Sequence, residues 1–372
     1  MIVKWLYVRN FRGFDDLAIE FGPKINEIVG RNAQGKTSLQ EAIYLCMTGS
    51  SFRTSAIRDL IKYEKEGFFV EIGFDKEGVS YELQFSFDGQ KRRIFLNHRP
   101  CDSITALIGQ LLGVICSPEV QSLVKGAPAV RRHFLDLSLA QIDPLYVHHL
   151  SRYSRALKQR NALLKAKDFR TIQSWEKELA HSASYITIAR VKIVGALRGR
   201  LTKYFSELSQ DEKQTKELDL SYETKAQMEG IDEIRAYFEQ EFVRRRYQEA
   251  AFGSTLVGPH RDDLLIFMGG KAVREFASEG EMRLTALSLK LAEWQHLKEH
   301  VEFPPLLLID DFGAYLDKER SAKLFDTISS FGQVFISTHS TNQQVAKTPS
   351  QLKTFFIENG KVEERMKGKD EG

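Results

Sequence analysis

The sequence predicts an α/β fold in which a phosphate-binding core is joined by an antiparallel β meander and interrupted by an inserted helical domain. Residues 30–37 have the form G-x-x-x-x-G-K-T and lie between a short apolar run and a helical pattern. Between residues 67 and 100 apolar and polar residues alternate, which is the period of strands with one buried face. A helical period then dominates until short β-like runs return. The expected units are a discontinuous core over 1–128 and 250–372 and a helical, coiled-coil-like insertion over 129–249.

The N-terminal elements are expected to be strands. Residues 1–8 and 17–21 are rich in β-branched and aromatic side chains, and Gly13 lies between them. Residues 25–29 form a further short run before the phosphate loop, where the charged Glu27 is unusual for a buried strand. Turns rich in Gly and Asp separate the strands of the meander, as they do in antiparallel hairpins.

Later elements follow from the same periodicities. The insertion is expected to contain an antiparallel pair of helices, a polar hinge over 207–219 and a third helix over 231–248. The elements expected after it are a strand at 264–267, a helix at 279–299, buried strands at 304–310 and 334–337, and a terminal hairpin at 355–362.

The stretch 30–37 has the composition of a phosphate-binding loop. Its glycines let the backbone curl, so that successive N–H groups point at phosphate oxygens. Lys36 brings positive charge to the β- and γ-phosphates, and the Thr37 hydroxyl can ligate Mg²⁺. The following helix directs its positive end at the same anion. The predicted nucleotide-binding residues of the loop are Gly30, Arg31, Asn32, Ala33, Gln34, Gly35, Lys36 and Thr37.

Two acids follow the apolar run 306–309. A buried strand would position Asp310 to hold Mg²⁺, and Asp311 stands where a catalytic base can polarise the attacking water. A plainer interpretation is an acid pair that caps a helix after a core strand. Together with Lys36 and Thr37, the nucleotide interpretation is favoured.

Three weaker motifs point to ATPase heads of the ABC type. Ser278 and Gly280 precede a helix and resemble the signature loop, whose Ser and Gly groups bind the γ-phosphate held by a partner subunit. Asp317, in Leu316-Asp317, resembles the D-loop, and His339 resembles the switch histidine that senses the γ-phosphate. Each is weak alone, because Ser-x-Gly is common and a histidine can simply cap a turn. Their order, with about 270 residues between the phosphate loop and the acids, predicts an ABC-type P-loop ATPase head split by a helical module.

Composition excludes several classes of protein. At 42% hydrophobic and 28% charged residues, the chain is typical of soluble globular proteins. No apolar run approaches the roughly 20 residues of a membrane-spanning helix, and the charged N-terminal stretch lacks the apolar core of a signal peptide. Cys46, Cys101 and Cys116 form no C-x-x-C pair. We therefore expect a cytoplasmic protein without a membrane anchor.

Charge is distributed unevenly along the insertion. Residues 131–204 carry 15 Lys and Arg against 5 Asp and Glu, whereas residues 207–241 carry 4 against 11. The two segments can be solvated helical faces that attract each other, or the basic one can form a surface for a polyanion. Charge alone does not decide between these interpretations.

Along its whole length the sequence resembles the RecF family of bacterial recombination-repair ATPases. The motifs that carry the resemblance are Asn10-Phe11-Arg12, the phosphate loop with Glu41-Ala42-Ile43-Tyr44, Ser117-Pro118-Glu119, Leu123-Val124-Lys125-Gly126-Ala127-Pro128, Arg131-Arg132-His133-Phe134-Leu135-Asp136 and Gly258-Pro259-His260-Arg261-Asp262-Asp263. The stretch 118–136 is the most specific to the family, because unrelated ABC ATPases lack it.

The resemblance implies an ATP- and Mg²⁺-dependent DNA-binding protein of recombinational repair that acts at gapped DNA. Two subunits would sandwich two ATP molecules, with slow hydrolysis as the switch, and RecO and RecR would be partners in loading RecA. It adds Arg12 to the expected nucleotide contacts and assigns catalytic roles to Lys36, Asp311 and His339. Candidates for contacts to DNA phosphates are Arg152, Arg155, Lys158, Arg190, Arg198 and Arg200.

Some positions depart from the family pattern. Glu279 and Glu281 stand where Gln is usual, and acids there would repel a phosphate unless they are protonated or paired, for example by Arg283. The alternatives that remain are an SMC-like head with a structural DNA-clamping role and a DNA-binding module with weak or lost ATPase. Against the SMC-like head, the chain has neither a long coiled coil nor a C-x-x-C hook.

Overall fold

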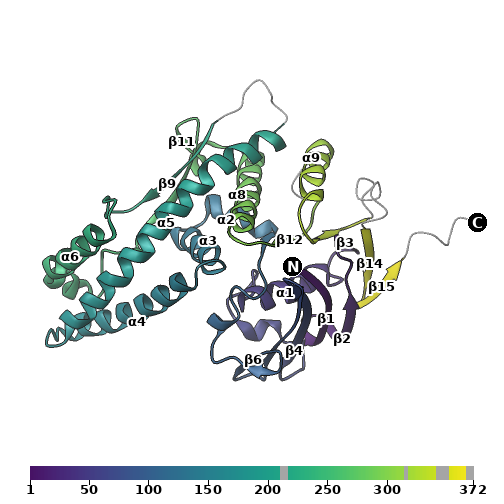
Figure 1. Ribbon diagram of the computed structural model, residues 1–372, viewed down its shortest axis with the longest axis horizontal. Helices are drawn as coiled ribbons and strands as arrows, with labels where there is room; N and C mark the ends of the chain where they lie inside the picture. Colours follow the sequence, from purple (N-terminus) through teal and green to yellow (C-terminus); the bar gives the residue numbers. More distant parts are fainter. Residues whose placement is uncertain (210–216, 314–316, 341–351, 366–372) are drawn as a thin grey trace, which may run out of the picture. The chain divides into compact units, whose positions relative to one another are not determined.

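The computed structural model describes residues 1–372 except 210–216, 314–316, 341–351 and 366–372 (Figure 1). The chain forms two compact units. Unit 1 comprises Met1–Gln121, Lys203–Thr215 and Ser278–Gly372, and unit 2 comprises Ser122–Thr202 and Lys216–Ala277.

A mainly parallel sheet forms the core of unit 1, in the strand order β15-β14-β3-β13-β12-β8. Its strands are β3 (Ile25–Val29), β8 (Gly113–Cys116), β12 (Leu306–Ile309), β13 (Val334–Thr338), β14 (Leu352–Glu358) and β15 (Lys361–Arg365). Only β14 and β15 pair antiparallel. Every residue of β3, β8, β12 and β13 is buried, as in sheets covered on both faces. The carboxyl ends of β3, β12 and β13 therefore share one edge, where ligands bind in open α/β sheets.

The predicted terminal hairpin, β14 and β15, belongs to this core sheet, because β14 pairs with β3. The same pairing places Thr354 opposite Glu27, and the Thr354 hydroxyl lies 3.4 Å from a carboxylate oxygen of Glu27. The charged residue that was unusual for a buried strand thus has a polar neighbour on the adjacent strand.

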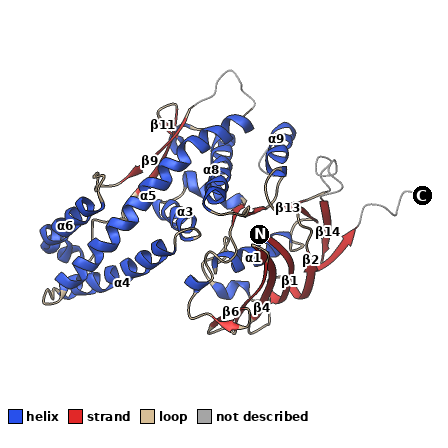
Figure 2. Ribbon diagram, viewed as in Figure 1, coloured by secondary structure: helices blue, strands red, loops and turns tan. Residues whose placement is uncertain are grey.

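The predicted meander belongs to a second, antiparallel sheet of unit 1, in the order β2-β1-β4-β5-β6-β7 (Figure 2). Its strands are β1 (Ile2–Phe11), β2 (Phe14–Glu20), β4 (Phe68–Lys76), β5 (Val79–Phe87), β6 (Arg92–Leu96) and β7 (Arg99–Pro100). Helix α1 (Lys36–Thr48) contacts β1, β4 and β5 of this sheet and β13 of the core sheet. It is almost wholly buried, so the phosphate loop precedes a rigid element. The other helices of unit 1 are α8 (Glu279–His300), α9 (Lys318–Ser329) and the short 3-10 segments η1 (Ile57–Leu60), η2 (Ile104–Ala106) and η3 (Pro118–Gln121).

Unit 2 is mainly helical but contains a small sheet. Its helices are α2 (Ser122–Lys125), α3 (Pro128–Ala140), α4 (Pro144–Ala166), α5 (Ile172–Leu208), α6 (Ile231–Phe252) and α7 (Val273–Phe276), with the end of α5 belonging to unit 1. Its strands are β9 (Leu218–Glu223), β10 (Asp263–Met268) and β11 (Lys271–Ala272), in the order β11-β10-β9.

The boundaries of unit 2 differ from the predicted insertion. The sequence predicts that the strand over 264–267 belongs to the core, but as β10 it pairs with β9 inside unit 2. The reason is that β9 begins at the end of the segment predicted as a polar hinge, where only the alternating Leu218 and Leu220 are buried. Two alternating apolar residues make a pattern too short to distinguish a strand from a loop.

A buried charge cluster connects the helices of unit 2. Arg160 interrupts the apolar period of α4, and its side chain is fully buried. It donates to Glu249 at 2.5 Å and to Glu176 at 3.1 Å, and its guanidinium lies over the ring of Phe242. Pairing with two acids from α5 and α6 compensates the desolvation of this cation. Among the described residues, no helix combines the length and apolarity needed to cross a membrane.

Candidate nucleotide-binding site

The loop between β3 and α1 has the backbone of a phosphate cradle. Ala33 and Gly35 have φ values of 63° and 113°, so the chain turns sharply before α1 begins at Lys36. At Gly35 a Cβ atom would lie 2.9 Å from the Phe14 ring, so glycine is required there by both conformation and space. The amide of Gly30 donates to the Thr338 carbonyl, which ties the loop to the end of β13.

Lys36 lies over this loop. Its Nζ donates to the carbonyl oxygens of Gly30 at 2.6 Å and of Arg31 at 2.9 Å. Burial lowers the pKa of Lys36, and the carboxylates of Asp311 and Asp310 oppose that shift. The ammonium group is therefore held among carbonyl and carboxylate oxygens, where a polyphosphate would find a preorganised cation.

Asp310 receives hydrogen bonds from two hydroxyl groups. Thr37 donates to Asp310 Oδ1 at 3.0 Å, and Ser337 donates to the same oxygen at 2.7 Å. Burial raises the pKa of Asp310, and these two hydrogen bonds oppose the rise. A hydroxyl and a carboxylate at this separation fit Mg²⁺, which takes few protein oxygens and completes its shell with water and phosphate. Within the described ranges, no group of three or more His, Cys, Asp or Glu side chains could hold a metal.

Asp311 lies next to the predicted switch histidine. Its carboxylate oxygen Oδ1 is 3.1 Å from Nε2 of His339, and its amide donates to Ser337 Oγ at 2.8 Å. Asp311 adopts a φ of 55°, a conformation unusual for a non-glycine residue. Backbone conformations of this kind cluster at functional sites. The structure thus brings Lys36, Thr37 and the acid pair together with His339, although their catalytic roles stay predictions.

Two residues that sequence reasoning did not single out hold this arrangement. Gln40, buried in α1, donates to the Ile309 carbonyl at 3.0 Å and so fixes the helix to the end of β12. Ser337 contacts both acids through its hydroxyl. The only sequence signal was their type, since a polar residue within an apolar helix or strand usually has a buried partner.

Arg12 lies in the turn between β1 and β2 of the antiparallel sheet and contacts helix α1. It donates to both carboxylate oxygens of the fully buried Glu41, at 2.8 and 2.7 Å, and to the Asp59 carbonyl at 2.7 Å. The bidentate pair positions the guanidinium beside α1 but commits three of its five donors. Its contact to nucleotide stays a prediction.

A pocket of about 770 Å³ adjoins the phosphate loop. It lies between the loop and the β14–β15 hairpin, and Gln34 accepts a hydrogen bond from the Asn359 amide across it. Its lining includes Gly30, Arg31, Gln34, His339 and Ser340. Such a pocket is large enough for a small ligand or for a segment of a partner chain.

The predicted signature loop is a helix N-terminus in this structure. Ser278 caps α8, accepting from the Glu281 amide, while one Glu281 carboxylate oxygen accepts from the Ser278 amide at 2.8 Å and from its hydroxyl at 2.9 Å. This is a capping box. Glu281, for which the sequence suggests Arg283 as one example of a partner, hydrogen-bonds Ser278. Asp317 likewise caps α9 by accepting from the Arg320 amide, and Leu316 lies outside the described residues.

The DNA candidates lie in different environments. Arg190 is excluded as a surface contact, because it is 3% exposed and donates to Asp136 at 2.6 Å and to the Pro259 carbonyl. The basic charge of α5 at this position serves the interior of unit 2. Arg152 pairs with Glu178, Arg198 pairs with Asp219, and Arg200 donates to the Ala196 carbonyl. Arg155 and Lys158 lie exposed on α4, and they remain candidates.

Comparison with known proteins agrees with this geometry. The family model described as RecF/RecN/SMC N terminal domain matches residues 2–363. A DNA replication and repair protein RecF of Protochlamydia amoebophila is 43% identical over 91% of this chain and 94% of its own length. One of Listeria monocytogenes is 35% identical over 97% of this chain and 99% of its own.

Solved structures extend the likeness to the fold. One described as the recombination mediator protein RecF with ATP in the RecFOR pathway superposes with a TM-score of 0.89 at 30% identity, covering 98% of this chain and 97% of that one. An Smc head domain from Pyrococcus furiosus, at 17% identity and a TM-score of 0.56, shares the fold alone. The matches span nearly the whole chain and include both units, and we conclude that this chain belongs to the RecF family of DNA replication and repair proteins.

Proposed function

We propose that this protein is an ATP-dependent DNA-binding protein of recombinational repair. The observation that carries the proposal is the convergence of Lys36, Thr37 and Asp310 at one sheet edge, with Thr37 and Asp310 3.0 Å apart. The names of the relatives, which include DNA replication and repair, and the solved RecF–ATP structure support it. Bound Mg²⁺ would be held by Thr37 and Asp310 and would neutralise charge on the β- and γ-phosphates.

ATP acts in this proposal as a dimerisation switch. Each subunit presents a phosphate loop, and Ser278 and Gly280 of a second subunit complete the binding site for the γ-phosphate. Gly280 supports this arrangement, because a Cβ there would meet no atom within 4 Å in this chain. Glycine in a helix interior costs about 1 kcal/mol relative to alanine, and the surroundings of Gly280 in this chain do not require it. Glycine at this position would let the backbone of the partner's nucleotide site approach closely.

The downstream role is loading of RecA at gapped DNA together with RecO and RecR, with slow hydrolysis resetting the switch in the cytoplasm. Asp311 would polarise the attacking water, and His339 would sense the γ-phosphate through its 3.1 Å contact with Asp311. A second candidate function is a DNA-binding module with weak or lost ATPase. It is favoured by Glu281, whose carboxylate occupies the donors of Ser278.

The test compares wild type with Lys36→Met for oligomeric state and affinity for gapped DNA, with and without ATP and Mg²⁺. ATP is expected to shift the wild type to a dimer and to tighten DNA binding, and to do neither in the variant. Binding should weaken steeply with salt, because phosphate contacts release counterions. If ATP changes neither quantity in the wild type, the switch is wrong. ATP-dependent dimerisation without measurable hydrolysis would favour the second candidate.

A further inference from the structure

In the part of the chain that the structure describes, one face of the antiparallel sheet of unit 1 is buried and the other carries half-buried or exposed side chains. Its inner face carries the buried Val8, Val70, Phe85 and Ile94 from β1, β4, β5 and β6, none more than 5% exposed. Side chains alternate between the faces of a strand, so the neighbouring residues of each strand point outward. These outward residues are half-buried or exposed and include aromatic rings and arginines.

One row of the outer face crosses four adjacent strands. Arg9 pairs with Phe69, Phe69 with Ser86, and Ser86 with Arg93, so these residues lie side by side from β1 to β6. The Arg9 guanidinium lies 5.9 Å from the centre of the Phe69 ring. At about 4.8 Å between strands, the part of the row from β1 to β6 spans about 14 Å, with a cation at each end and an aromatic ring between them. Beyond Arg9, strand β2 places Asp16 opposite it.

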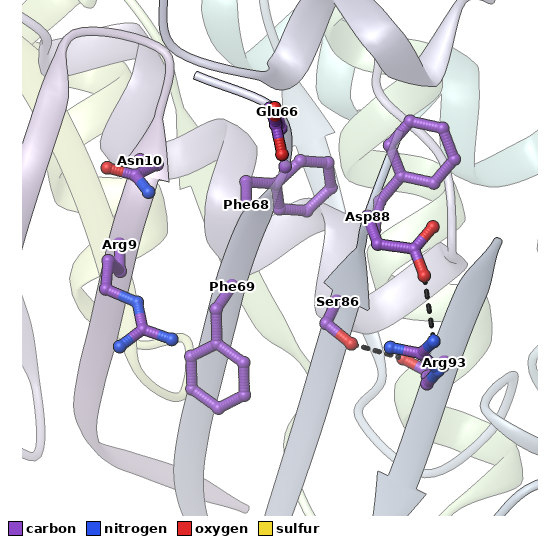
Figure 3. A pocket seen from close by; sticks show the side chains of 10 residues that line it. Arg9, Asn10, Glu66, Phe68, Phe69, Ser86, Asp88 and Arg93 are labelled. Atoms are coloured by element: carbon purple, nitrogen blue, oxygen red, sulfur yellow. Dashed lines mark hydrogen bonds and ion pairs between the residues drawn. The ribbon is translucent and has the colours of Figure 1, made fainter. Parts of the chain in front are cut away.

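The row borders a pocket of about 380 Å³ (Figure 3). In this view Phe69 lies between Arg9 and Ser86, and Arg93 lies beyond Ser86. The pocket is also lined by Asn10, Glu66 and Asp88. The next row of the same face adds Tyr7 and Phe95, and the Tyr7 ring lies 6.0 Å from that of Phe69.

The acids that line this pocket neutralise its cations only weakly. Asp88 accepts from the amides of Gln90 and Lys91, and these backbone bonds lower its pKa and commit its charge to the β5–β6 turn. Its 2.8 Å ion pair with Arg93 is exposed to solvent, so exchanging it for another anion costs little. Lys91 adds an exposed cation in the same turn, whereas Glu66 is the one further acid of the lining.

We propose that this outer face binds single-stranded DNA, with a base stacked on Phe69 and flanking phosphates held by Arg9 and Arg93. Open sheets that bind single strands use this combination of exposed rings and cations. A duplex hides the faces of its bases, and a four-stranded sheet is too wide for a major groove that admits two strands. The inference rests on the proposed function, because gapped DNA carries a single-stranded segment beside its duplex.

The test measures binding of the full-length protein to a fluorescein-labelled oligothymidylate and to a duplex of equal length, by anisotropy with ATP and Mg²⁺. Phe69→Ala and Arg93→Ala are each expected to weaken oligothymidylate binding about tenfold and to leave duplex binding unchanged. Arg93→Ala should also reduce the slope of log affinity against log salt by about 0.7. Phe69→Trp should retain binding, which separates loss of the ring from loss of the fold.

Arg92→Ala is the matched control, since Arg92 neighbours Arg93 but lies on the opposite side of β6. It is expected to bind the single strand like wild type. Equal weakening by Arg92→Ala and Arg93→Ala would mean that the basic turn, and not the sheet face, attracts DNA. Unchanged binding by Phe69→Ala would also overturn the inference. Duplex binding without oligothymidylate binding would reject this face and leave the proposed function standing, whereas binding of neither DNA would reject the proposed function itself.

Discussion

At the scale of single residues, Glu281 competes with the proposed nucleotide contact of Ser278. Its carboxylate accepts from the amide and the hydroxyl of Ser278, the two donors that the proposed dimer assigns to the partner's γ-phosphate. A carboxylate and a phosphate cannot share these donors without strong repulsion. The capping box that stabilises α8 in one subunit thereby opposes closure of the dimer.

Glu281→Gln should relieve this conflict. Glutamine also forms a capping box, so α8 keeps its N-terminal structure while the negative charge is removed. The variant is expected to reach half-dimerisation at an ATP concentration about fivefold or more below that of wild type. Sedimentation velocity across an ATP titration measures this. Glu299→Gln removes the same charge from the other end of α8 and should change nothing; an unchanged midpoint in Glu281→Gln would show that its carboxylate does not compete.

His260 makes stability depend on pH. Burial lowers its pKa to about 4 from 6.5, while its ring lies between Tyr153 and the Thr255 carbonyl. Below pH 6.5 the unfolded chain binds a proton that the folded chain resists, so this residue's contribution to stability falls as pH drops from 6.5 toward 4.

The corresponding experiment compares wild type with His260→Gln in urea unfolding at pH 7 and pH 5. The free energy of unfolding of wild type should fall relative to that of the variant by up to about 2 kcal/mol over this interval. The difference between the two proteins is the informative quantity, because the buried Asp262 also changes stability over this interval. Its pKa rises to about 6, so its contribution to the free energy of unfolding grows as pH falls, and it does so in both proteins. A difference that stays constant between the two pH values would contradict the assignment.

At the scale of elements, the cluster around Arg160 joins three helices of unit 2. Replacing Arg160 by Met would leave Glu249 buried without its cation, whereas Glu176 would keep Arg246. Loss of one partner of a buried pair is costly, so Arg160→Met should lower the free energy of unfolding by about 3 kcal/mol. Chemical denaturation measures this loss. Arg155→Met, on the exposed side of the same helix, is the control and should cost less than about 0.5 kcal/mol; equal costs would mean that the cluster does not stabilise the unit.

The elements also show where sequence patterns suffice. The phosphate loop, the meander and the apolar strands 306–309 and 334–337 could be predicted because each has a strong local pattern. That the acid pair and Thr37 belong to one site could be predicted, because the carboxyl ends of parallel strands share one edge of the sheet. By contrast, β9 and the role of β10 depend on pairing between segments about 40 residues apart, which no local period encodes. Arg190 looked like a surface cation because charge counts do not reveal burial.

At the scale of the whole molecule, we propose that the nucleotide site in each chain is half of a site. In this proposal the phosphate loop supplies Lys36 and Thr37, the end of β12 supplies Asp310, and a second copy supplies Ser278 and Gly280. Within the described residues, no hydrogen bond joins Ser278 to the phosphate loop of its own chain. Lys36 should therefore matter for assembly as much as for hydrolysis.

Mixing two defective variants tests this claim most directly. Lys36→Met and Ser278→Arg should each fail to dimerise with ATP and Mg²⁺, but every mixed pair contains one intact site, built from the loop of one chain and the signature residues of the other. With random pairing, an equimolar mixture should regain about a quarter of the wild-type sites, detected as ATP-dependent dimer by sedimentation velocity. A mixture that forms no more dimer than the two variants measured separately would contradict the shared site.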